Sequence, residues 1–121
     1  MNVDLLISIP GKGILLTWRD DEYTGAGWHI PGGIIRFKEM AKKRVDLVAK
    51  GELGIKIDLA TGPVEINEIL ANQKDRSHFI SLLYACSIDK ENLEIINNKI
   101  LQKPKQINFF KKKTKKSNFM A

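Results

Sequence analysis

The stretch from Gly32 to Ile55 decides the fold. It reads Gly-Gly-Ile-Ile-Arg-Phe-Lys-Glu over residues 32–39, continues with a helical pattern, and closes with Glu-Leu-Gly-Ile over residues 52–55. At about 100° per residue, one line of the helix carries the apolar residues Ala41, Val45 and Val48. Glu52 is the next residue on that line, whereas the charged residues cluster on another face: Lys42, Lys43, Asp46 and Lys50. The helix therefore places an acid where a core residue is expected.

A lone carboxylate in an apolar stripe is costly unless a cation or hydrogen-bond donors satisfy it. The glycine pair upstream allows a backbone turn to approach a ligand or metal closely. One hypothesis is a hard metal ion bound by Glu52 and a loop carbonyl, with phosphate oxygens completing its coordination. The alternative is an acid near a fraying helix end that reaches into water. The residues alone leave both interpretations open.

The same stretch resembles the Nudix box. Six residues match the box at the correct spacing: Gly33, Glu39, Ala49, Glu52, Gly54 and Ile55. The lead-in Trp28-His29-Ile30-Pro31-Gly32-Gly33 is also similar to that family, as is the order of strands and helix over residues 3–88. Three residues depart from the box, because an arginine and two acids are replaced by Leu47, Val48 and Gly51. This shortage of acids resembles the GDP-mannose mannosyl hydrolase branch.

The resemblance implies an α/β/α sandwich with a mixed sheet, here with a shortened C-terminal part. It further implies a hydrolase of a nucleoside diphosphate derivative, such as a nucleotide sugar, that uses Mg²⁺ or Mn²⁺ and forms a homodimer. Glu52 and the Gly32 carbonyl would bind the metal, and Arg19 would bind the diphosphate. Glu39 would hold the loop in place through hydrogen bonds without binding the metal itself. Loss of the box acids leaves a catalytically impaired nucleotide-binding module as the alternative.

Other candidate residues remain weaker. Arg36 follows the glycines and could contact phosphate, or it could lie in a solvated loop. Trp28 could stack on a nucleobase, although a core position is equally compatible with its size. In the branch that the chain resembles, the general base is a histidine on a late loop, but no histidine follows His78. The sequence therefore assigns no base.

The charge of the chain is unevenly distributed. The 121 residues carry a net charge of +6, yet residues 102–121 contain seven lysines and no acid, which leaves 13 basic and 14 acidic groups in the rest. We expect a domain over residues 1–101 and a lysine-rich, disordered tail over residues 102–121. The tail lacks the aromatic spacing of a nucleic-acid-binding arm, so nucleic acid is not the expected partner.

The lengths of the apolar runs, the cysteine count and the motif spacings exclude several classes of protein. No apolar run is long enough to span a membrane, and the single cysteine, Cys86, rules out an internal disulfide, so we expect a cytoplasmic protein. The chain contains no P-loop and no Cys/His zinc spacing. The pattern predicts strands at residues 3–9, 14–18, 28–30, 64–70 and 78–87 and a helix at 40–53, which Gly54 is expected to end. Residues 90–101 could be a helix or a strand-bearing loop.

Overall fold

The computed structural model describes residues 1–21, 25–59, 61–70 and 78–111. The elements of this part of the chain are, in order, β1 (Asn2–Ile9), β2 (Gly13–Asp21), β3 (Gly25–His29), β4 (Gly32–Ile34), α1 (Ala41–Val48), η1 (Ala49–Leu53), β5 (Asp58–Leu59), β6 (Glu65–Leu70), β7 (His78–Ser87), α2 (Lys90–Gln102) and β8 (Ile107–Phe110). The five strands expected from the sequence are all present. Within the described residues, β4, β5 and β8 are additional, and α2 settles the choice left open after Ile88 in favour of a helix.

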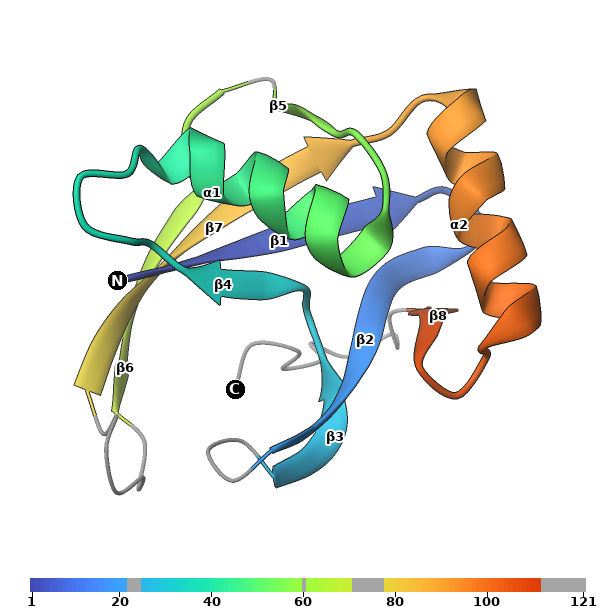
Figure 1. Cartoon of the computed structure of the whole chain (residues 1–121), viewed down its shortest axis with the longest axis horizontal. Coiled ribbons are helices and arrows are strands. Elements are labelled where there is room, and N and C mark those ends of the chain that lie inside the picture. The colour runs from blue at the N-terminus through green and yellow to red at the C-terminus, as the bar shows by residue number, and fades with distance from the viewer. Residues whose placement is uncertain (22–24, 60, 71–77, 112–121) are drawn as a thin grey trace.

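The strands form one mixed sheet. Its main path runs β3-β2-β1-β7-β5, with β4 paired to β1, β6 to β7 and β8 to β2. The pair β1–β7 is parallel and the other pairs are antiparallel. Figure 1 shows that α1 lies across β1 and β4. The other helix, α2, lies near β2 and β8 on the right of the same view. The predicted α/β sandwich with a mixed sheet and a short C-terminal part is confirmed.

The main core forms where the alternating apolar residues of β1 meet the two helices. Val3, Leu5 and Ile7 are fully buried on one face of β1, as period-2 alternation requires. Both helices add fully buried residues to the same cluster, including Val45 of α1 and Ile96 of α2. Each fully buried aliphatic side chain contributes about 1.5–3 kcal/mol relative to an exposed one. The core therefore fixes both helices against the same part of the sheet.

The central helix follows the predicted stripe but changes its winding. Val45 and Val48 are buried and the lysine-rich face is exposed, as expected. α1 ends at Val48, and residues Ala49–Leu53 continue as the π-helical turn η1. Gly54 then ends the segment in the left-handed region at φ 69°, which confirms its predicted role as the terminating glycine. π-Helical turns inside helices occur frequently at functional sites, and this one carries Glu52.

The C-terminal boundary differs from the one expected. Asp89 caps α2 by accepting a hydrogen bond from the Asn92 backbone N–H at 2.8 Å. Beyond α2, β8 pairs with β2 from Thr17↔Ile107 to Ile14↔Phe110. The domain therefore extends past residue 101 and includes part of the segment assigned to the tail. The expected disorder of residues 102–121 is therefore wrong for the part that ends α2 and forms β8, and residues 112–121 lie outside the described residues.

None of the helices in the described part of the chain is long and apolar enough to cross a membrane.

Candidate functional site

A pocket of about 410 Å³ opens between β2, the π turn and α2. Its wall consists of Thr17, Trp18, Arg19, Glu52, Lys99, Gln102, Lys103, Gln106 and Ile107. Three of these side chains are cationic and one is acidic. The pocket is therefore electropositive and suited to an anionic ligand.

Arg19 joins two of the residues singled out from the sequence. Its Nη2 atom donates a hydrogen bond to the Gly32 carbonyl oxygen at 3.1 Å and lies 3.5 Å from Glu52 Oε1. The arginine comes from β2, the glycine from the start of β4, and the acid from the π turn. The Arg19 and Glu52 side chains are 29% and 37% exposed. An ion pair of this length and exposure is weak, so the guanidinium can leave the carboxylate when a ligand binds.

Asp4 belongs to the same cluster, although the sequence analysis did not identify it. It lies on β1 directly opposite Gly32 in the strand register and accepts a hydrogen bond from the Ser81 hydroxyl group. Burial raises the Asp4 pKa, while the hydrogen bond from Ser81 and the charge of Arg19 oppose that rise. The signal for this residue was present in the sequence, because Asp4 is an acid inside an otherwise apolar strand pattern.

The protonation of Glu52 depends on the same neighbours. Desolvation raises the Glu52 pKa despite its partial exposure, and the nearby Asp4 charge raises it further. The Arg19 charge and a hydrogen bond from the Gly32 backbone oppose that rise. Two carboxylates with raised pKa values therefore face one guanidinium. Such a position favours added positive charge.

The donor set fits one hard metal ion. The Gly32 carbonyl and the Glu52 carboxylate converge on a single point, because both lie within 3.5 Å of the same nitrogen of Arg19. Oxygen ligands of this kind suit Mg²⁺, which often binds through one or two carboxylates plus substrate phosphates and water. The described residues contain no group of three or more His, Cys, Asp or Glu side chains that could hold a metal. Among the described residues, even a single ion would thus need water and ligand oxygens in addition to Glu52 and the Gly32 carbonyl.

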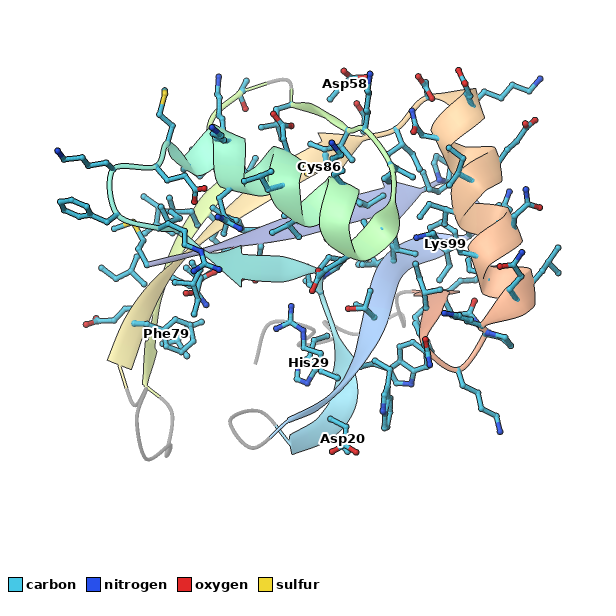
Figure 2. The ribbon with its side chains drawn as sticks, viewed as in Figure 1. Asp20, His29, Asp58, Phe79, Cys86 and Lys99 are labelled. Atoms are coloured by element: carbon cyan, nitrogen blue, oxygen red, sulfur yellow. The ribbon has the colours of Figure 1, made fainter. Side chains whose placement is uncertain are left out.

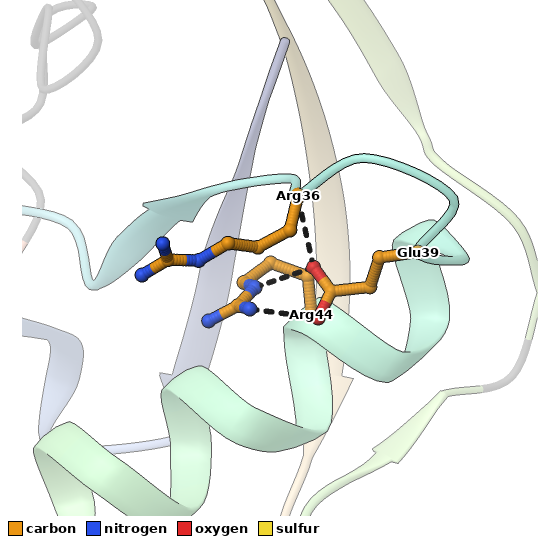
Figure 3. A network of polar contacts seen from close by, with 3 residues as sticks. All are labelled: Arg36, Glu39 and Arg44. Carbon is orange, nitrogen blue, oxygen red and sulfur yellow. Dashed lines mark hydrogen bonds and ion pairs between the residues drawn. The ribbon is translucent and has the colours of Figure 1, made fainter.

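Glu39 holds the loop that precedes α1. Its carboxylate accepts two hydrogen bonds from the Arg44 guanidinium, both at 2.7 Å, and one from the Arg36 backbone N–H at 3.0 Å (Figure 3). The paired, two-point geometry is the strongest form of this contact. These bonds fix the chain between the glycine turn and the helix that carries Glu52.

Two predicted substrate-binding residues are not part of the pocket wall. Trp28 packs between Trp18 and Phe110, with ring centroids 5.6 and 4.8 Å away. Trp18, which is 42% exposed, lines the pocket instead. Arg36 lies on the loop braced by Glu39, where its backbone N–H makes the contact drawn in Figure 3. Neither Trp28 nor Arg36 is among the pocket-lining residues of the described chain.

The structure adds two cationic residues that the sequence analysis missed. Lys99, in the last turn of α2, and Lys103, the residue directly after that helix, both line the pocket. Their spacing of four residues would place two side chains on one face of a helix that continued to residue 103, but α2 ends at Gln102, so sequence spacing alone does not give their arrangement. Cys86 is excluded as a nucleophile, since it is buried and burial raises its pKa to about 12.

This fold and pocket define an α/β protein built around a glycine turn and a box helix. A scan against models of known protein families finds no match. The chain is similar to the Low-salt glycan biosynthesis protein Agl8 of Haloferax volcanii, with 28% identity over 99 residues. That match covers 78% of this chain and 63% of the relative, so the chain spans less than two thirds of the length of the relative.

Several solved structures with a similar architecture carry Nudix names. A mutT/nudix family protein from Listeria innocua matches with a TM-score of 0.66 at 21% identity, over 91% of this chain and 76% of that one. A NUDIX hydrolase from Nitrosomonas europaea matches with a TM-score of 0.61 at 14% identity, over 74% of this chain and 58% of that one. The chain therefore has the Nudix fold, which confirms the fold that the box residues imply.

Proposed function

We propose that the chain is a hydrolase of a nucleoside diphosphate derivative, with a nucleotide sugar such as GDP-mannose as substrate and Mg²⁺ or Mn²⁺ as cofactor. The observation that carries this proposal is the convergence of Glu52, the Gly32 carbonyl and Arg19 at the wall of an electropositive pocket. A sugar-linked substrate is supported by the name of the Haloferax relative, which refers to glycan biosynthesis. The six matching box residues support the same reaction class.

Each residue has a defined part in this proposal. Glu52 and the Gly32 carbonyl hold the ion, which would neutralise the diphosphate and improve it as a leaving group. Arg19 turns from Glu52 to the diphosphate, where its planar group can bind two phosphate oxygens at once. Trp18 provides an exposed aromatic face at the pocket wall for the nucleobase. Glu39 acts only on the loop through its bonds to Arg44 and Arg36.

A second candidate is a nucleotide-binding module without turnover. It is favoured by a specific observation, because the Arg19 guanidinium already lies between the two oxygens that would hold the ion. Leu47, Val48 and Gly51, which replace an arginine and two acids of the box, point in the same direction. The two candidates share the pocket and the ligand class and differ in whether product forms.

The first prediction tests the hydrolase. Glu52→Gln keeps the size of the side chain but removes its charge, so we expect metal-dependent turnover to fall by about 100-fold or more while the fold is retained. Purified protein is incubated with Mg²⁺ and a panel of nucleotide sugars, and the products are separated by chromatography. GDP plus free sugar indicates cleavage between the sugar and the diphosphate, and in ¹⁸O-labelled water a label in the sugar then indicates attack at the sugar carbon, whereas a label in GDP indicates attack at phosphorus. GMP plus sugar phosphate indicates attack at phosphorus within the diphosphate.

The matched control is Glu94→Gln, which removes one charge from an exposed position on α2. Wild-type activity in Glu52→Gln contradicts the metal assignment. Ligand binding by the wild-type chain without any product supports the binding module. We further propose that the protein acts in the cytoplasm and forms a homodimer. Size-exclusion chromatography with light scattering measures the molar mass and so tests the oligomeric state.

A further inference from the structure

The electropositive character of the pocket comes mainly from the C-terminal end of α2 and the residue that follows it, which lie outside the Nudix box. Lys99 and Lys103 line the pocket together with Arg19. Within the described residues, neither lysine forms an ion pair, since the salt bridges there join Arg19 to Glu52 and Arg44 to Glu39. Two ammonium groups thus face the cavity that Glu52 also lines, and neither forms an ion pair with a described acid.

Lys99 is held at a defined place. A side-chain atom built on Gly54 would lie 2.9 Å from Lys99 Nζ, so the ammonium group packs closely against the glycine that ends the box segment. Figure 2 shows Lys99 directed from α2 toward the turn that follows η1 and away from the outer face of the helix. The glycine leaves the space that this ammonium group needs, which ties the end of the box to the α2 side of the pocket.

The net charge of the pocket-lining side chains balances the charge of a diphosphate without a metal ion. Arg19, Lys99 and Lys103 carry three positive charges and Glu52 carries one negative charge, which leaves an excess of two. A nucleoside diphosphate linked to another group carries two negative charges, one on each phosphate. The C-terminal end of α2 contributes a partial negative charge of roughly half a unit, which is small beside two full ammonium charges.

We propose that Lys99 and Lys103, together with Arg19, form the phosphate-binding part of the pocket, so that the diphosphate of the ligand binds without a divalent ion. This inference rests on the proposed ligand class but not on turnover. Binding then depends on α2 and ionic strength, whereas hydrolysis depends on Glu52 and the metal. The same geometry serves the hydrolase and the binding module alike.

The experiment measures binding of GDP-mannose by isothermal titration calorimetry, once in EDTA and once in Mg²⁺. We expect the wild-type chain to bind in EDTA with an affinity within about threefold of that in Mg²⁺. Lys99→Ala and Lys103→Ala should each weaken binding about tenfold, the loss typical of one charge-assisted hydrogen bond. Lys99→Arg and Lys103→Arg should restore most of it, and binding should weaken as salt rises.

Lys90→Ala is the matched control, because Lys90 is an exposed lysine at the start of the same helix and does not line the pocket. It should bind as the wild type does. Guanosine, which lacks phosphate, separates base contacts from phosphate contacts, and its binding should be equal in all variants. Circular dichroism melts verify that each variant is folded.

Two results overturn the inference while leaving the proposed function intact. If the wild-type chain binds GDP-mannose in Mg²⁺ but not in EDTA, the diphosphate is bound through the metal ion. If the Lys99→Ala, Lys103→Ala double variant binds GDP-mannose with wild-type affinity, the two lysines do not bind the diphosphate. If neither GDP-mannose nor any other nucleoside diphosphate derivative binds or is hydrolysed in either buffer, the proposed function fails together with the inference.

Discussion

At the scale of single residues, Gly32 connects the strand register to the site. Its carbonyl accepts the Arg19 hydrogen bond, and its Cα faces the Asp4 side chain across the β1–β4 pair. A Cβ at this position would overlap the Asp4 carboxylate and lie 2.7 Å from the Val3 carbonyl oxygen. Position 32 therefore requires glycine because there is no room for a side chain, and not because its φ is positive.

Gly32→Ala should lower the free energy of unfolding by about 1–3 kcal/mol, because the new methyl group must push β1 and β4 apart. It should also weaken ligand binding, since the carbonyl moves with the strand. Urea denaturation measures the first effect and calorimetry the second. Gly62→Ala is the control, because no atom lies within 4 Å of the added methyl group there, and its stability should stay within about 0.5 kcal/mol of the wild type.

At the scale of elements, the loop before α1 depends on one ion pair. The Arg44 hydrogen bonds lower the Glu39 pKa below its ordinary value of 4.5, and the Arg36 backbone N–H lowers it further. The charged form of Glu39 is therefore favoured in the folded state. Because the loop leads directly from the glycine turn into the helix, loosening it changes the angle at which that helix presents Glu52.

Glu39→Gln should be less stable than the wild type at neutral pH, because it loses the charged, two-point contact with Arg44. A carboxylate with a lowered pKa stabilises the fold above its unfolded value, and this contribution disappears as pH falls through the folded value. The difference in melting temperature between wild type and variant should thus be constant above pH 5 and shrink below about pH 4.5. A difference that stays unchanged down to pH 3 would contradict this assignment.

At the scale of the whole molecule, β8 and α2 complete the pocket. Ile107 at the start of β8 lines the pocket and is also part of the main core, with 6% of its surface exposed. Pairing of β8 with β2 brings the end of α2 beside Arg19. The stability of the domain and the shape of the site therefore depend on the same C-terminal segment.

Ile107→Ala should cost about 2–5 kcal/mol in the free energy of unfolding, because it leaves a cavity where β8 meets the core. The measurement is urea denaturation followed by circular dichroism. Leu101→Ala is the control, since Leu101 is 80% exposed at the end of α2, and we expect it to change stability by no more than about 0.5 kcal/mol. Equal stability of the two variants would place β8 outside the cooperative unit.

The sequence by itself determined the glycine turn, the buried stripe of α1, the terminating role of Gly54 and the main strands. These features follow from local periodicity and backbone preference, which act over a few residues. It also singled out Arg19, Gly32 and Glu52, which the structure brings together. It did not predict that Trp28 would lie outside the pocket or that residues 107–110 would join the sheet.

Only the tertiary structure decided which side chains share the pocket. Asp4 lies on β1, Lys99 on α2 and Lys103 directly after α2, and Lys103 is 99 residues from Asp4 in the chain. Their common surroundings arise because β1 pairs with β4 while β8 pairs with β2 and draws the end of α2 beside Arg19. A single-sequence pattern contains no information on such distant contacts, since packing of the core and strand pairing create them.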